Sequence, residues 1–194
     1  MPVTAEDVDA WLRGLRLTPA ERADRDGIVS WDLVLDGHRR HDIRITLILD
    51  PRLALLCWVH YAPPLNDSFR VSYRKFLRWN DELPFVKFAL STDERPVLTS
   101  EIAVGGLDSE ALGLAIARLL AVCDLLVDES LSWLWPGVKR APLPLRPSRN
   151  EGLLDRYAAQ LAELNGLREG APGELSGPGE LSGPGETDRG DPTD

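Results

Sequence analysis

The order of the regular segments in residues 4–132 constrains the fold of this chain more than any single motif. Apolar residues recur at helical spacing in some segments and alternate with polar residues in others. The predicted helices span residues 4–15, 68–83 and 108–132, and the predicted strands span residues 28–35, 42–49, 53–60, 85–91 and 96–104. The order α-β-β-β-α-β-β-α predicts an α+β fold, a two-layer α/β sandwich whose helices chiefly cover one face of a mainly antiparallel five-stranded sheet.

The third predicted strand differs from its neighbours because it is apolar on both faces. Residues 53–59 read Leu-Ala-Leu-Leu-Cys-Trp-Val, whereas the two strands before it alternate apolar and polar residues. Alternation is typical of a sheet with one covered face, and a continuous apolar run is typical of a strand inside a sheet. This run is therefore predicted to be central.

The chain divides into four parts. Residues 1–135 hold the predicted sandwich and suffice for one hydrophobic core. Residues 136–149 are rich in proline and predict an extended connector. Residues 150–166 return to helical spacing and predict an amphipathic helix. In residues 167–194 the unit Pro-Gly-Glu-Leu-Ser-Gly occurs twice and begins a third time, so we expect a disordered acidic tail.

Charge and cysteine content limit the partners and the compartment. The whole chain has a net charge of −9, and residues 167–194 contribute −5 of it with seven acidic and two basic residues. Residues 1–166 therefore carry only −4 and are mildly acidic. This argues against nucleic acid or an anionic membrane as the main partner.

No run approaches the ~18 apolar residues of a membrane span, and residues 1–7 lack the features of a secretory signal. Cys57 and Cys123 are predicted to be buried thiols, so we expect a cytoplasmic protein.

The histidines favour structural roles over chemistry. His38 and His41 flank two arginines, and zinc needs three or four ligands, so an exposed polar loop is favoured. His60 has no nucleophile or carboxylate that the sequence identifies as its partner in base catalysis. We therefore expect no metal, no cofactor and no enzyme activity.

The glycines and strand acids also favour structural roles. Gly105-Gly106 precedes a helix with an acidic first turn, which favours a turn and a cap over a phosphate site. Asp32, Asp42 and Glu101 alternate with apolar residues, as on a solvated sheet face.

The predicted helix 68–83 carries an apolar arc wider than one sheet contact requires, which predicts binding to a protein client or to a second copy. A separate row of Arg70, Arg74 and Arg78 is either a solvated face, which is favoured, or a rim that contacts an acidic segment. Asn80 lies within the apolar arc, and we predict that it bonds backbone groups freed at the helix end. The candidate binding residues in the whole chain are Tyr73, Phe76, Leu77, Trp79, Trp133, Trp135, Leu153, Tyr157 and Leu161.

The helix of residues 150–164 has an apolar stripe that needs a partner surface. It could dock on its own body or on a second subunit, and the length of the connector slightly favours exchange. Trp133 and Trp135 could anchor that connector or pack beneath it.

Several strings resemble the YbjN-like family, which is described as candidate sensory-transduction regulators and is similar to type III secretion chaperones of the Tir-chaperone class. The matching features are the element order, Leu77-Arg78-Trp79-Asn80, Pro84-Phe85-Val86-Lys87-Phe88, residues 99–104 before the glycine turn, and Leu107-Asp108. The resemblance covers about residues 26–133. It implies a dimer-forming α/β sandwich that binds other proteins, and it implies no catalytic residue.

The sequence thus favours a non-enzymatic, chaperone-like or regulatory protein-binding module, which we expect to be homodimeric. One alternative is a small-ligand sensor or enzyme with a pocket between sheet and helices. Another is an accessory protein associated with nucleic acid, for which the Arg70 row would have to join a larger basic patch.

Overall fold

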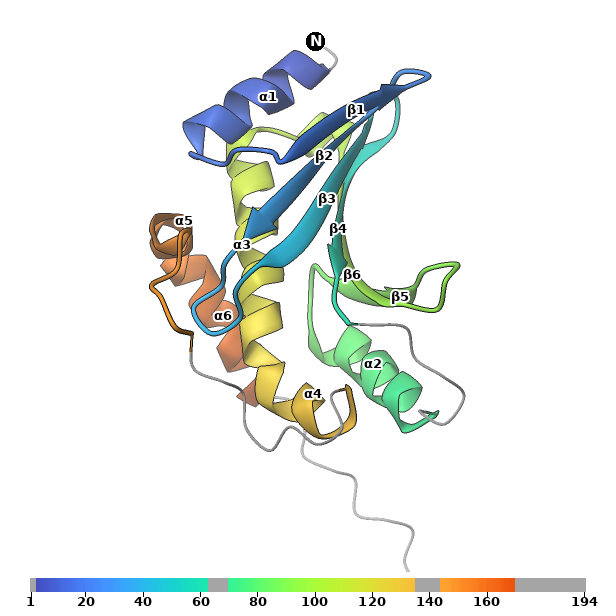
Figure 1. Ribbon diagram of the computed structural model, residues 1–194, viewed down its shortest axis with the longest axis vertical. Helices are drawn as coiled ribbons and strands as arrows, with labels where there is room; N and C mark the ends of the chain where they lie inside the picture. The colour runs from blue at the N-terminus through green and yellow to red at the C-terminus, as the bar shows by residue number, and fades with distance from the viewer. Residues whose placement is uncertain (1–2, 63–69, 135–143, 170–194) are drawn as a thin grey trace, which may run out of the picture.

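The computed structural model describes residues 3–62, 70–134 and 144–169, and these form an open antiparallel sheet with helices (Figure 1). The strands are β1 (Glu21–Arg25), β2 (Ile28–Leu35), β3 (Ile43–Asp50), β4 (Ala54–His60), β5 (Lys87–Leu90) and β6 (Pro96–Ala103). The helices are α1 (Ala5–Gly14), α2 (Arg70–Glu82), α3 (Ser109–Leu125), α4 (Val127–Leu134), α5 (Glu151–Arg156) and α6 (Ala158–Glu169). No helix in these ranges is both long and apolar enough to cross a membrane.

The sheet has six strands in the order β1-β2-β3-β4-β6-β5, so the expectation of five strands is wrong. The missed strand is β1, whose sequence Glu-Arg-Ala-Asp-Arg has no apolar alternation because it lies at an edge with little burial. Arg25 pairs with Ile28 across Asp26-Gly27, and both turn residues have positive φ (55° and 81°). This two-residue turn is typical of a tight hairpin. Strand β4 lies between β3 and β6, which confirms its interior position.

The described helices gather on one face of the sheet, where the core lies. The inward residues of the central strands are fully buried, among them Trp31, Ile45, Leu47, Leu55 and Leu98. Helix α3 runs along this face in Figure 1, and α1 packs beside it. The buried residues of α3 occupy more than half of its circumference, as expected when a helix is covered on more than one side.

Two long predicted helices are each divided in the structure. The predicted helix 108–132 becomes α3 and α4, with Leu126 as the C-cap residue of α3 between them. The predicted helix 150–164 becomes α5 and α6 around Tyr157, and α6 continues to Glu169. These two helices lie against the far side of α3 in Figure 1, so they add a partial third layer to the expected two. Of the predicted tail, residues 170–194 lie outside the described residues.

Short polar motifs fix the helix ends as predicted. Thr4 and Asp7 form a reciprocal capping box at α1. Gly105 and Gly106 belong to a 3₁₀ turn, and Asp108 caps α3 by accepting a hydrogen bond from the N–H of Ala111 (2.8 Å). The turn and the cap are therefore structural features, as the sequence indicated.

Candidate functional site

Helix α2 is fastened to the edge strand β5 by the side chain of Asn80. The amide nitrogen of Asn80 donates to the carbonyl of Phe88 (3.1 Å), and its amide oxygen accepts from the N–H of Phe88 (2.6 Å). Lys87 donates to the carbonyls of Asn80 and Leu83 near the end of α2. The structural role of Asn80 is confirmed, but it satisfies the backbone of β5, and Lys87 satisfies the helix end. The two strings that resemble the YbjN-like family thus supply the hydrogen bonds between α2 and β5.

Two of the candidate binding residues on α2 belong to the core of the chain itself. Phe76 is 6 % exposed and Trp79 is 1 % exposed, and the rings of both contact Phe88. The prediction that they form a binding surface is wrong, because helical spacing cannot reveal that β5 folds over them. Leu77 is 70 % exposed and Tyr73 is half-buried, so these two stay candidates.

The structure describes the other candidate binding residues near α2 and α4 only in part. Arg74 and Arg78 are exposed, as a rim or a solvated face requires. The side chains of Arg70 and Trp133, and the whole of Trp135, lie outside the described part of the chain. Their roles stay predictions.

The C-terminal arm, defined as residues 144–169, packs on α3 of its own chain. Leu153 and Tyr157 are 6 % and 2 % exposed, and Leu161 is half-buried. The slight preference for exchange onto a second subunit is therefore not what the structure shows. Gly113 of α3 makes close packing possible, because a Cβ there would collide with the phenol of Tyr157. The hydroxyl of Tyr157 donates to Glu110 (3.2 Å).

The polar contacts of the arm converge on Asp36, which follows β2 and is fully buried. Arg149 donates to both carboxylate oxygens of Asp36 (2.8 Å each), and Arg146 donates to the same carboxylate. The backbone N–H of Asp36 donates to Asn150 (2.8 Å). Both arginines also pair with Asp42 (2.7 and 3.0 Å), which has φ 55° and precedes β3 instead of lying on the solvated sheet face that we expected.

These contacts set the ionisation of Asp36. Burial by itself raises the pKa of a carboxyl group. Here the hydrogen bonds from Arg149, Arg146 and backbone N–H groups together outweigh burial, and they hold the pKa of Asp36 well below its usual range. Asp36 therefore stays ionised and keeps both arginines bound at neutral pH.

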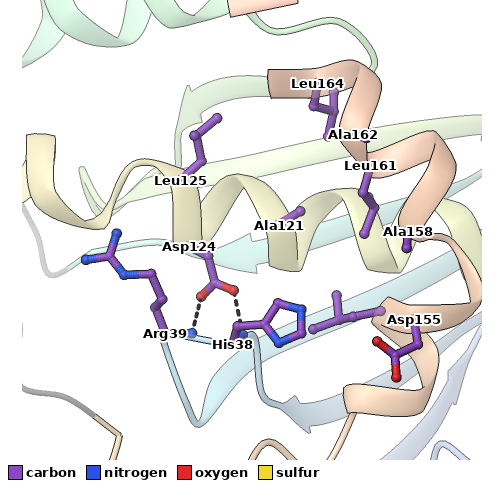
Figure 2. A pocket seen from close by; sticks show the side chains of 11 residues that line it. His38, Arg39, Ala121, Asp124, Leu125, Asp155, Ala158, Leu161, Ala162 and Leu164 are labelled. Atoms are coloured by element: carbon purple, nitrogen blue, oxygen red, sulfur yellow. Dashed lines mark hydrogen bonds between the residues drawn. The ribbon is translucent and has the colours of Figure 1, made fainter. Parts of the chain in front are cut away.

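A second carboxylate, Asp124 of α3, is enclosed by the loop between β2 and β3. It accepts hydrogen bonds from the backbone N–H groups of His38 (2.5 Å) and Arg39 (3.0 Å), which Figure 2 shows, and from that of Arg40 (2.7 Å). A Cβ on Gly37 would collide with the same carboxylate, so glycine permits this close approach. The loop that carries two histidines and two arginines is thus a structural cap on the last turn of α3.

A groove of about 460 Å³ remains between the arm, α3 and this loop (Figure 2). Its floor is apolar and includes Ala121, Leu125, Leu161 and Leu164. Of its polar lining residues, Asp124 is engaged by the loop backbone and Arg39 pairs with Asp128 (2.7 Å). The groove is therefore apolar at its base, and these two polar groups at its rim are already engaged.

The sheet face opposite the helices carries an apolar strip that the candidate list missed. Ile48 lies directly opposite Leu56 across β3 and β4, and Trp58 lies one step along β4 on the same face. All three are half-buried, and no described helix covers them. The signal was present in the sequence, because a strand that is apolar on both faces has an apolar outer face as well as an inner one.

Polar residues border this outer strip on both sides. One cross-sheet row runs Ser30, Ile48, Leu56, Glu101, and the next runs Asp32, Thr46, Trp58, Thr99, Lys87. Asp32 accepts a hydrogen bond from the hydroxyl of Thr46 (2.6 Å). An apolar centre with a polar rim is the usual anatomy of a protein-binding surface.

The other polar candidates show no assembled chemistry in the described residues. His38 is exposed and His41 is half-buried, and no group of three or more possible metal ligands occurs among the residues of the three described ranges. His60 stacks on Trp58 with ring centroids 6.2 Å apart. Burial raises the pKa of the Cys57 thiol to about 12 and that of the Cys123 thiol to about 11, so neither is an activated nucleophile.

Comparison with known proteins identifies the domain. No match was found among proteins with curated function. The sequence profile of the YbjN family, described as "Putative bacterial sensory transduction regulator", matches residues 4–131. The match covers α1 through most of α4, and it includes the Asn80–Phe88 connection and both borders of the outer strip, but not the arm. The chain belongs to the YbjN family.

Proposed function

We propose that this chain is a non-enzymatic, regulatory protein-binding module that acts in the cytoplasm. The observation that carries the proposal is the apolar strip of Ile48, Leu56 and Trp58 on the outer sheet face. An antiparallel sheet with one solvated face normally alternates apolar and polar residues. A strip of large apolar residues on that face fits a surface that a partner covers.

The partner would be a segment of another protein or a second copy of this chain. The central apolar residues would supply most of the binding energy, and Glu101, Lys87 and Asp32 at the borders would select among partners. Leu77 and Tyr73 on α2 form a second candidate surface for self-association, as in the homodimer that the sequence analysis expects.

A small-ligand sensor is the second candidate function, and the groove of about 460 Å³ beside α3 favours it. A small-molecule site normally offers a few convergent polar groups in an apolar cavity. At this groove Asp124 and Arg39 already bond within the protein, and His38 and Asp155 are the other polar residues that line it. Because the outer sheet strip combines large apolar residues with a polar border, we favour the protein-binding module.

The test compares Ile48→Thr/Leu56→Thr with Leu77→Thr, which alters the competing candidate surface on α2. A binding protein is isolated from a cytoplasmic extract, identified by mass spectrometry, purified and titrated against each form. We expect the outer-face variant to weaken binding at least tenfold, about 1.4 kcal/mol, and Leu77→Thr to leave it unchanged. Light scattering of the same samples measures self-association.

A reversed result, in which only Leu77→Thr weakens binding, would move the site to α2. If neither variant affects any protein complex while a metabolite fraction raises Tm of the wild type, the sensor would replace the binding module.

A further inference from the structure

The C-terminal arm covers a surface of a domain whose family match ends before the arm begins. The YbjN profile ends at residue 131, and the described arm starts at residue 144. Yet α3, which belongs to the matched domain, is buried on the side that the arm occupies, around Gly113 and Ala117. The arm is therefore an additional element that supplies the second cover of an apolar helix.

The arm is attached by apolar contacts with the core and by polar contacts that are concentrated at two places. Its large buried side chains are Leu153, Leu154, Tyr157 and Leu164. Its charged contacts involve two places, the carboxylate pair of Asp36 and Asp42, and Glu110, which pairs with Arg156. Arg146 and Arg149 are 39 % and 49 % exposed at their side chains, so water already reaches both groups.

Detachment of the arm would leave no charge stranded in the interior. Asp36 is fully buried in the presence of the arm, and Arg146 and Arg149 supply most of the hydrogen bonds to its carboxylate, so we expect water to reach it when they leave. A carboxylate that becomes hydrated does not carry the large cost of a buried, unpaired ion. The groove beneath α6 shows in addition that the arm does not fill the surface that it covers.

The side of α3 that the arm covers would present apolar residues to solvent after detachment. Gly113, Ala117 and Ala121 lie four residues apart and form a row of small side chains along the helix. Small residues let a second helix approach closely, as Tyr157 does at Gly113. A second cover of the same chemistry, an amphipathic helix with large apolar side chains, would fit this row.

We propose that the arm is an exchangeable cover of α3, and that it gives way to an amphipathic helix of the same kind from another polypeptide. The latch of Asp36 with Arg146 and Arg149 sets how readily the arm leaves. This surface is separate from the outer sheet strip, so it adds a second, self-covered binding surface to the domain.

The test uses the full chain and a fluorescent synthetic peptide of residues 144–169 as the probe. The peptide carries the native arginines, and it is titrated against the wild type, Arg146→Gln/Arg149→Gln, and the control Arg95→Gln, which removes the exposed pair with Asp93 in the β5–β6 hairpin. We expect the latch variant to bind the peptide at least tenfold more tightly than the other two, because its own arm competes less well. Equal binding to all three proteins, or binding to none, would overturn the proposal.

Hydrogen exchange of the wild type provides a second test that does not depend on a variant. We expect amides of α5 and α6 to exchange through an opening that leaves β2, β3 and β4 protected. Exchange of arm and sheet amides in one common unfolding event would overturn the proposal. Ile48→Thr/Leu56→Thr should leave peptide exchange unchanged, so failure of the outer-face function and failure of the exchangeable cover are distinguishable.

Discussion

Asn80 occupies the position beside Phe88 that the backbone of another strand would take, because its side-chain amide both donates to and accepts from the Phe88 peptide group. Edge strands with free backbone groups promote association between chains, and native proteins block them in several ways. Here the blocking group comes from the helix that precedes the strand. One residue thus joins α2 to the sheet and protects part of its edge.

Replacement of Asn80 by leucine should lower the free energy of unfolding by about 1–3 kcal/mol, the cost of leaving partly buried backbone groups without partners. Urea denaturation followed by tryptophan fluorescence measures the change. Arg78→Leu, an exposed substitution on the same helix, is the control and should change stability by no more than about 0.5 kcal/mol. Equal stability of Asn80→Leu and the wild type would show that the amide contributes nothing to folding.

The latch carboxylate predicts how stability depends on pH. The pKa of Asp36 in the folded protein is depressed below its unfolded value of about 3.9, so its stabilisation is fully present above that pH and is lost as the pH falls further. Asp36→Asn should reduce stability at pH 7 by up to about 3 kcal/mol, toward the low end for a broken buried pair because both arginines are half-exposed.

The measurement is thermal unfolding at several pH values between 2 and 7. The difference between the wild type and Asp36→Asn should shrink below about pH 4, because the carboxylate of the unfolded state takes up a proton there while that of the folded state stays ionised. Asp155→Asn, which alters an exposed acid of the same arm, should follow the wild-type curve. A difference between wild type and Asp36→Asn that stays constant down to pH 2 would contradict the assigned ionisation.

Two glycines in helices provide a matched pair for the contact between the arm and α3. Gly113→Ala should destabilise the protein by about 1–2 kcal/mol, because overpacking against Tyr157 outweighs the gain in helix propensity. Gly152→Ala, whose Cβ would meet no atom, should stabilise α5 by about 0.5–1 kcal/mol. Chemical denaturation measures both, and Tyr157→Phe combined with Gly113→Ala should recover part of the loss. A stabilising Gly113→Ala would mean that the arm is not packed closely at this point.

The two thiols should be unreactive in the native protein. Cys57 and Cys123 are fully buried, and burial raises their pKa to about 12 and about 11, so the reactive thiolate is scarce at pH 8. Titration with Ellman's reagent should detect neither thiol in the folded protein and both in 6 M guanidinium chloride, the concentration chosen for full unfolding. Rapid modification of one thiol under native conditions would show that the core around β4 or α3 opens locally.

The resemblance to the YbjN family rested on residues that proved to be structural. Asn80 belongs to one of the matching strings and Lys87 and Phe88 to the other, but the hydrogen bonds between them depend on how the chain turns at residues 83–86. Phe85 in that turn has φ 66°, a conformation that no apolar pattern predicts for phenylalanine.

The sequence by itself determined the kind and order of the elements from α1 to α3 apart from β1, because alternation and helical spacing record which face of each element meets the core. It also determined the caps at Thr4 and Asp108, since these are local bonds. Only tertiary structure decided that β1 forms at the edge, since its pairing comes from β2 and the Asp26-Gly27 turn rather than from its own residues. In the same way, only the fold brought Arg149 to Asp36 across 113 positions of sequence, and only the placement of all described helices on one face left Ile48, Leu56 and Trp58 without a helix over them. Long-range contacts of this kind depend on how elements pack, and the pattern within each element does not contain that information.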